Sequence, residues 1–353
     1  MSARSRDRRV YLRSHPVLFA LLAATRRRHP LRLGGTILVH EQAAYVDALT
    51  RIPLDRTAEG TTGGAAGRLT GADLLFDQQG DDHRRARRST AELFAAAGVA
   101  RIRPVWRSVL AERLAPLAAG APIDLVPIAA ELAGATTAAL LEIDVDPVEL
   151  ARAALAAAAT ATRAHLPGPG RRRAGPEAQV AAARLSALAR PGGGAGTGFA
   201  TMIAVAAVNT TVAALPRAAA WAADADLWAY ADRQSLADEL LRVTAPAPLL
   251  PRVAAGPGLA GRCPVRPGDR LLLSARHAVD AHRRDPDPAA PAPAQVAQLV
   301  FGAGPHACPG ARLARTQLAD LLAALAPHRP RVLRARADPR AALPSWRSLV
   351  IQA

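Results

Sequence analysis

The most constraining stretch of this 353-residue chain is residues 301–315, where one cysteine lies in a loop of glycine and proline. The stretch reads FGAGPHACPGARLAR, with the cysteine at 308, and its continuation predicts an amphipathic helix over about 310–325. Such a loop leaves backbone N–H groups without strand or helix partners, so that they can point at the sulfur. The helix start adds its positive end. Both effects favour the thiolate of Cys308, which is the form that binds a metal.

The surroundings of this cysteine narrow the kind of metal site. No second cysteine and no histidine at metal-ligand spacing lies nearby to complete a zinc site. One thiolate in a preformed loop therefore indicates an iron whose other ligands come from a macrocycle, that is, a haem. The alternative for a lone cysteine is a buried and inert side chain. The only other cysteine is Cys263, so the chain has no disulfide framework and fits a reducing cytoplasm.

Composition sets the class of protein. Half of the residues are hydrophobic, which is enough for a large core and excludes a disordered chain. The net charge of +16 comes entirely from arginine, because the sequence contains no lysine, and the arginines are spread along the chain. Without clustered charge and stacking aromatics we expect no nucleic-acid partner. A basic docking face for an acidic protein remains open.

The N-terminal region carries an apolar run over residues 17–24, between Arg8-Arg9 and Arg26-Arg27-Arg28. This order of charges also occurs in signal peptides. The run is too short to span a bilayer and has arginine on both sides, so it predicts a first amphipathic helix. We expect no membrane partner, a cytoplasmic protein, and a disordered tail at 1–10.

Periodicity predicts a mainly α protein with small β-sheets, in one large domain over 1–353. The segments 52–80, 167–176 and 191–198 are rich in glycine, proline or polar residues and are interpreted as loops. Helices are predicted at 82–96, over much of 104–160, and at 199–223 and 235–244. Strands are predicted at 30–33 and 36–40, around 268–280, and within 330–353.

The cysteine loop resembles the haem-binding signature of the cytochromes P-450, Phe-x-x-Gly-x-x-x-Cys-x-Gly. The matching residues are Phe301, Gly304, Cys308 and Gly310, and His306 and the tail Leu313-Ala314-Arg315 are also typical of bacterial members. The resemblance implies the cytochrome P-450 fold and haem b (iron protoporphyrin IX). It makes Cys308 the iron ligand and places Phe301, Gly302 and Gly310 beside the cofactor.

A second motif is Glu239-Leu240-Leu241-Arg242, where residues i and i+3 share one face of a helix. Any surface helix can carry such a pair. The prolines that follow resemble the segment after the Glu-x-x-Arg pair of the family. The resemblance implies that this pair locks the segment before the cysteine loop, and that Arg252 binds a haem propionate.

His83 and Arg87 lie one helical turn apart in a basic helix. One interpretation is a solvated basic face. The resemblance assigns both residues to the haem propionates, together with Arg252 and His306, because carboxylates at a buried edge need such donors. The neighbours Arg84, Arg85 and Arg88 are then expected to face solvent, where a redox partner would dock.

The long helix carries Ala206-Ala207-Val208-Asn209-Thr210-Thr211, which resembles the oxygen-activating motif of the family. The resemblance makes Thr210 the hydroxyl that takes part in proton delivery. A threonine in mid-helix can instead bond its own i−4 carbonyl. Asn209 replaces the usual acid and cannot titrate at neutral pH, and Ala207 replaces a glycine where the helix normally opens.

The family resemblance implies a haem-thiolate monooxygenase that oxidises a small, largely apolar molecule with O₂. Two electrons would come from a ferredoxin and its reductase, and the setting would be a tailoring step in bacterial secondary metabolism. Two alternatives stay open. The same fold could catalyse desaturation, cyclisation, coupling or a redox-neutral rearrangement without oxygen insertion, or the chain could be an inactive haem-binding module that recruits other enzymes.

Overall fold

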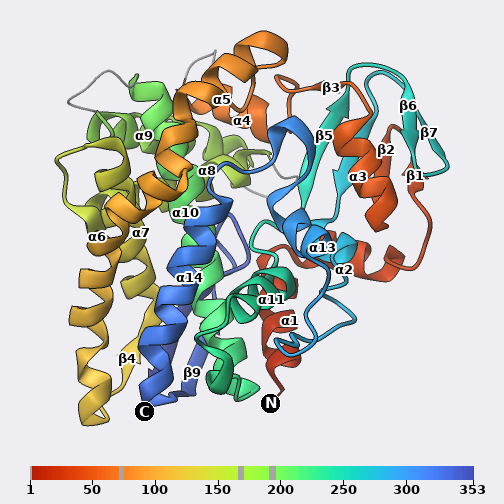
Figure 1. Ribbon diagram of the computed structural model, residues 1–353. Helices are drawn as coiled ribbons and strands as arrows, with labels where there is room; N and C mark the ends of the chain where they lie inside the picture. The colour runs from red at the N-terminus through yellow and green to blue at the C-terminus, as the bar shows by residue number, and fades with distance from the viewer. Residues whose placement is uncertain (1, 71–74, 166–170, 191–195) are drawn as a thin grey trace.

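The computed structural model describes residues 2–70, 75–165, 171–190 and 196–353. They form one mainly helical domain with small sheets, as the periodicity predicted, with the largest sheet to one side of the helices (Figure 1). The helices are α1 (Ala3–Ser14), α2 (Pro16–Thr25), α3 (Gln42–Thr50), α4 (Thr62–Thr70), α5 (Gly80–Phe94), α6 (Ala96–Leu114), α7 (Leu125–Leu141), α8 (Pro147–His165), α9 (Arg171–Leu188), α10 (Thr197–Asp224), α11 (Gln234–Thr244), α12 (Ala275–Ala278), α13 (Ala294–Gln298) and α14 (Ala311–Leu325).

The strands form three sheets. The largest has the order β1-β2-β8-β5-β3, the second β4-β10-β9 and the third β6-β7. Their bounds are β1 (Leu31–Leu33), β2 (Thr36–Val39), β3 (Leu54–Asp55), β4 (Ile123–Asp124), β5 (Leu250–Ala254), β6 (Gly258–Ala260), β7 (Cys263–Val265), β8 (Arg270–Leu273), β9 (Arg331–Ala337) and β10 (Trp346–Gln352). The predicted strands at both ends of the chain are confirmed. Strands β2 and β8 pair in parallel. This pairing joins the N-terminal hairpin of β1 and β2 to the segment that precedes the cysteine loop.

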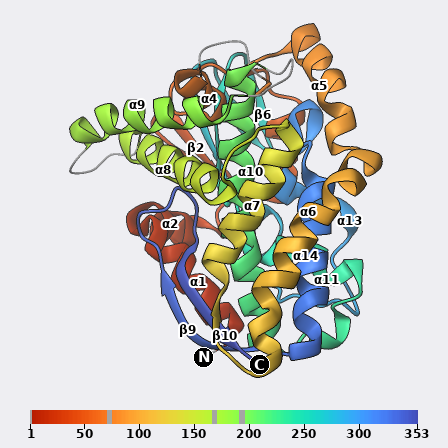
Figure 2. The ribbon, with the colours of Figure 1, turned by 90° about the vertical axis from the view of Figure 1, so that its left-hand side faces the viewer.

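Helix α10 is the centre of the helical part, and it packs against α7, α8, α11 and α14 (Figures 1 and 2). Its sequence is apolar on nearly all faces, and this pattern correctly predicted a central helix over 199–223. Among the described helices, α10 is the one long and apolar enough to cross a membrane. Most of that stretch is buried inside the fold, as in the core helix of many proteins.

The N-terminal residues correct one expectation, because they form α1 where a disordered tail was predicted for 1–10. The Ser2 side chain accepts a hydrogen bond from the Ser5 N–H and so caps the helix. One face of α1 is buried and carries Asp7, Val10 and Tyr11. Tertiary contacts of this face therefore order the segment as a helix.

The interpretation of 52–80 as a loop is wrong for part of the segment, which contains β3 and α4. Glycines caused the error. A Cβ at Gly63 would lie 2.1 Å from the Arg56 carbonyl oxygen, and one at Gly64 would lie 2.2 Å from that of Ala58. These glycines do not break the helix but let its first turn approach the preceding backbone closely.

The other two predicted loops are only partly described. Helix α9 occupies 171–188, so the second half of the expected loop at 167–176 is helical. The alanine-rich remainder of α9 favours helix strongly enough to continue through Pro176. Residues 166–170, and 191–195 of the third predicted loop, lie outside the described residues.

Candidate functional site

The cysteine loop runs from the short helical turn Leu299–Phe301 to the start of α14. The Cys308 N–H donates to the Phe301 carbonyl at 2.8 Å, and the Ala307 N–H donates to that of Gly304 at 3.1 Å. Gly302 and Gly304 have φ of +80° and +71°, a region that disfavours every residue with a Cβ. The loop is thus a closed structure whose shape depends on Gly302 and on Gly304 of the motif.

The sulfur of Cys308 is held near Gly310 and Phe94. A Cβ at Gly310 would lie 3.8 Å from both Cys308 Sγ and Phe94 Cε1, so this corner is closely packed. The Gly310 N–H and the charges of Arg87 and Arg315 lower the pKa of the Cys308 thiol, and the protein packed around the sulfur raises it. Cys308 itself is an exposed residue.

Arg315, on the first turns of α14, ties this loop to α11. Its guanidinium lies over the Phe301 ring, 4.7 Å from the centroid. Its Nε donates to Asp238 at 2.5 Å, and its Nη2 donates to Gln298 Oε1 at 2.9 Å. Arg315, the last residue of the Leu313-Ala314-Arg315 sequence that follows the motif, thus holds the cysteine loop in place.

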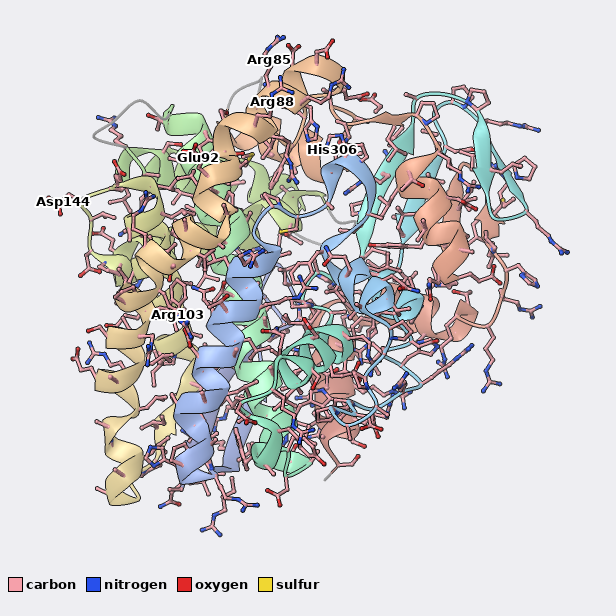
Figure 3. The ribbon with its side chains drawn as sticks, in the orientation of Figure 1. Arg85, Arg88, Glu92, Arg103, Asp144 and His306 are labelled. Atoms are coloured by element: carbon pink, nitrogen blue, oxygen red, sulfur yellow. The ribbon has the colours of Figure 1, made fainter. Side chains whose placement is uncertain are left out.

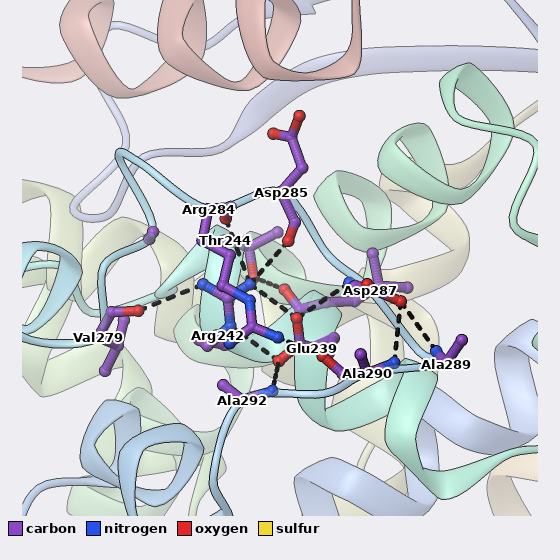
Figure 4. A network of polar contacts seen from close by, with 12 residues as sticks. Glu239, Arg242, Thr244, Val279, Arg284, Asp285, Asp287, Ala289, Ala290 and Ala292 are labelled. Atoms are coloured by element: carbon purple, nitrogen blue, oxygen red, sulfur yellow. Dashed lines mark hydrogen bonds and ion pairs between the residues drawn. The ribbon is translucent and has the colours of Figure 1, made fainter.

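The Glu239–Arg242 pair on α11 is fully buried, which excludes the surface alternative (Figure 4). Arg242 donates two hydrogen bonds to the carboxylate, at 2.9 and 2.7 Å. Its remaining donors reach the carbonyls of Val279, Arg284 and Asp285. The carboxylate accepts the N–H groups of Asp287 and Ala292, at 3.1 and 2.9 Å.

This network fixes the segment 279–292, which leads to the cysteine loop. Burial raises the pKa of Glu239, but the bonds from Arg242 and the two N–H groups lower it more, so the carboxylate stays charged. The pair therefore forms the lock that the resemblance implied.

Basic side chains from separate elements gather beside the cysteine loop. The His83 ring on α5 lies 3.8 Å from that of His306 in the loop, centroid to centroid. Arg87, one turn along α5, donates to the Ala307 carbonyl at 2.8 Å. Arg252 on β5 and Arg56, just after β3, are both buried, and their charges act on His306. The structure thus brings together His83, Arg87, Arg252 and His306.

The pKa values of Arg56 and His306 are lowered within this basic cluster (Arg56, His83, Arg87, Arg252 and His306). Burial lowers the pKa of His306 to about 3, and the nearby positive charges lower it further. Burial and the charge of Arg252 lower the pKa of Arg56 to about 9. Among the described residues, no acid contributes to the shifts of Arg56, His83 or His306. The buried Arg56 guanidinium has no ion pair with an acid among the described residues, which is costly, so the cluster fits a ligand with anionic groups.

Arg56 is a candidate residue that the sequence analysis missed. It is 7% exposed, and its Nε atom is buried without a hydrogen-bond partner among the described residues. A single arginine in a segment rich in glycine and threonine gives no periodic signal. Only its burial beside His306 identifies it, and burial depends on the tertiary fold.

The three remaining candidate residues, Ala207, Asn209 and Thr210, lie on the central helix α10. Asn209 is buried, and its Nδ2 donates to the carbonyls of Val205 at 2.8 Å and of Ala154 on α8 at 3.3 Å. Thr210 Oγ1 donates to the Ala206 carbonyl at 2.8 Å, which is the i−4 bond of the alternative interpretation. Ala207 is half-buried. The hydrogen bonds of Asn209 and Thr210 therefore end on α10 and α8 and do not reach the cysteine loop.

The three neighbouring arginines of α5 are exposed, as predicted. Arg85 and Arg88 point outward from the outer side of α5, away from the helical core (Figure 3). Arg84 and Arg85 form ion pairs with Asp81 and Asp82, one turn before them. Of these three arginines, only Arg88 thus forms no ion pair with an acid among the described residues.

Comparisons with known proteins show the fold. No family model matches the sequence, and no curated protein matches it. Solved structures of cytochromes P450 match over nearly the whole chain. P450BioI, in complex with an acyl carrier protein ligated to hexadec-9Z-enoic acid, is 18% identical with a TM-score of 0.77, over 97% of this chain and 98% of that one.

Two further structures agree. Ligand-free CYP164A2 from Mycobacterium smegmatis is 22% identical, with a TM-score of 0.75 over 97% of each chain. Epothilone D-bound P450epoK is 16% identical, with a TM-score of 0.75 over 97% of this chain and 96% of that one. The chain therefore has the cytochrome P450 fold, as its motifs predicted.

Proposed function

We propose that this chain, which has the cytochrome P450 fold, is a haem-thiolate monooxygenase that oxidises a small, largely apolar organic molecule. The observation that carries the proposal is the basic cluster beside the cysteine loop, in which the buried Nε atom of Arg56 has no hydrogen-bond partner among the described residues. A haem has two propionates and an iron that accepts one thiolate, so it satisfies the cluster and the cysteine together.

The residues present fit haem b. Cys308 would ligate the iron, with Phe301, Gly302 and Gly310 beside the ring. Arg56, His83, Arg87, Arg252 and His306 would hold the propionates. When bound, a thiolate-ligated haem supplies activation of O₂ with two electrons. The Gly310 N–H and the charges of Arg87 and Arg315 would help to hold Cys308 as the thiolate that the iron requires.

On α10, Thr210 would hold the proton-relay hydroxyl, and Ala207 would narrow the groove beside it. Asn209 cannot exchange a proton at neutral pH, and its amide is bonded to α8. Protons would therefore travel through water to Thr210, or arrive slowly. This observation supports the second candidate, which keeps the haem but catalyses desaturation, cyclisation, coupling or rearrangement. An inactive recruitment module is the third candidate.

Electrons would come from a ferredoxin and its reductase. Arg88 is exposed on α5, the helix whose Arg87 contacts the cysteine loop, so an acidic ferredoxin could dock close to Cys308. We place the enzyme in the cytoplasm, in a tailoring step of bacterial secondary metabolism. Structures with the same fold include EryK in complex with erythromycin B and P450epoK bound to epothilone D.

A carbon-monoxide difference spectrum of the reduced protein tests the proposal. We expect the red-shifted haem-thiolate band, its loss in C308S, and its persistence in C263S, which changes the other cysteine. A protein that takes up no haem, or a C308S variant that keeps the band, contradicts the assignment. With a substrate in hand, turnover under ¹⁸O₂ separates the candidates, because only oxygen insertion labels the product.

A further inference from the structure

Helix α2 is apolar on the side that packs against the protein and also on the side that is exposed. Its inner side packs Phe19 and Leu22 against Leu38 of the large sheet. Its exposed residues are Pro16, Val17, Ala20, Leu21 and Ala24. Val17 is 86% exposed and Leu21 41%. A surface helix normally turns polar residues outward, so this apolar stripe requires an explanation.

Arginines flank the stripe at both ends. Arg13 is exposed at the end of α1, and Arg27 and Arg28 are exposed just after α2. None of the three forms an ion pair with a described residue, and the nearby acid Glu41 is bonded to His29 at 2.7 Å. Arg8 and Arg9 extend the basic surface along α1. Figure 2 shows α2 at the edge of the molecule, beside α1 and near the β9–β10 pair.

We propose that the exposed stripe of α2 and the arginines around it dock the protein on a bilayer that contains anionic phospholipids. Apolar residues would enter the boundary between headgroups and acyl chains, and the arginines would pair with lipid phosphates. The expectation of no membrane partner rested on a run too short to span. A helix that lies in the plane of the interface does not need spanning length.

Charge decides between this occupant and a second copy of the chain. A symmetric dimer over α2 would bring the flanking arginines of both copies together, and the net charge of +16 adds repulsion. An acidic protein would satisfy the arginines but would also need an apolar patch for Val17 and Leu21. An anionic bilayer supplies both chemistries over the whole stripe.

Sedimentation of the haem-loaded protein with vesicles tests the proposal. We expect it to pellet with vesicles of phosphatidylcholine and phosphatidylglycerol, much less with phosphatidylcholine alone, and less as salt rises. V17S/L21S keeps every charge and removes the apolar contact, and R27Q/R28Q does the reverse. Each should weaken binding to the mixed vesicles by about tenfold or more.

Matched controls lie elsewhere on the surface. V180S changes a valine of α9 that is 72% exposed, and R101Q/R107Q removes two exposed arginines of α6. Both should bind like the unmodified chain. The proposal is overturned if mixed vesicles do not pellet the protein, or if V17S/L21S binds as well as V180S. A dimer in light scattering that V17S/L21S abolishes would also overturn it, because the stripe would then belong to a second copy.

Discussion

The Nδ2 atom of Asn209 donates to the carbonyl of Ala154 at 3.3 Å, and this bond joins the central helix α10 to α8. The same amide donates to Val205 at 2.8 Å, so its donors face two carbonyl oxygens. Asn209 is 7% exposed, so this buried hydrogen bond contributes to the packing of α10 against α8. An acid at this position would have to change its partners.

We expect N209D to lower the free energy of unfolding by about 1–3 kcal/mol at pH 7, because a carboxylate cannot donate and would face two carbonyls. N209A removes the same bonds without adding a charge and should cost less. Urea denaturation at pH 7 and pH 5 checks this, since protonation of the new acid should restore part of the loss. Equal stability of N209D and the unmodified chain would mean that the side chain does not bind α8 in solution.

The buried Glu239–Arg242 pair leads to a second prediction. E239Q keeps the shape but leaves the guanidinium of Arg242 without a carboxylate, so we expect a loss of about 3–5 kcal/mol. D226N is the matched control, because its ion pair with Arg329 at 2.9 Å is exposed. It should cost about 1 kcal/mol or less.

Denaturant midpoints of the two variants decide the matter. A cost for E239Q as small as that for D226N would show that the buried network does not fix the segment 279–292. Haem content measured alongside should fall in E239Q only, because that segment leads to the cysteine loop.

Sequence reasoning located the cysteine loop, the Glu239–Arg242 pair and the central helix because each has a local signature. A motif with fixed spacing, or an apolar face repeated over several turns, can be interpreted without knowing the fold. Helix α4 was missed since Gly63 and Gly64 resemble helix breakers. Only the folded structure shows why glycine is needed there, because a Cβ at Gly63 would lie 2.1 Å from the carbonyl oxygen of Arg56.

Two features of the site depend on residues far apart in the chain. Arg56 became a candidate because it is buried near His306 and Arg252, which lie on other elements. The direction of the Asn209 amide depends on its hydrogen bond to Ala154 on α8, which is separated from α10 in the chain by α9.

Arg56 supports a third prediction, which concerns haem retention. If its guanidinium holds a propionate, R56L loses a charge-assisted hydrogen bond worth about 1.5–3 kcal/mol, so haem should leave about tenfold faster or more. R56K should be intermediate, because it keeps the charge but not the planar group. Transfer of haem to apomyoglobin measures the rate. R85L, on the exposed side of α5, is the control. An R56L rate equal to that of R85L, with a raised rate in R252L, would exclude Arg56 from the haem site.

The last prediction concerns acid stability, which depends on a buried histidine cluster. His277 Nδ1 lies 2.9 Å from His40 Nδ1, and the rings of His277 and His282 are 4.8 Å apart. Burial lowers the pKa of His40 and of His282 to about 4, and that of His277 to about 2. The positive charges of Arg26 and Arg276 lower the pKa of both His277 and His282 further, and those of Arg4 and Arg283 add to this effect on His282.

Because these pKa values are lower in the folded state than the ordinary value of 6.5, protons bind the unfolded chain first. The cluster therefore contributes its full stability above about pH 6.5 and loses it as the pH falls towards 4. Each histidine weakens folding by up to about 1.4 kcal/mol per pH unit in this window. We expect the denaturation midpoint to fall steeply between these pH values, and H282L to reduce the slope by about one proton. H328L, at a half-exposed position outside the cluster, should leave the slope unchanged. The same slope in H282L as in H328L would show that His282 is already exposed to water in the folded protein.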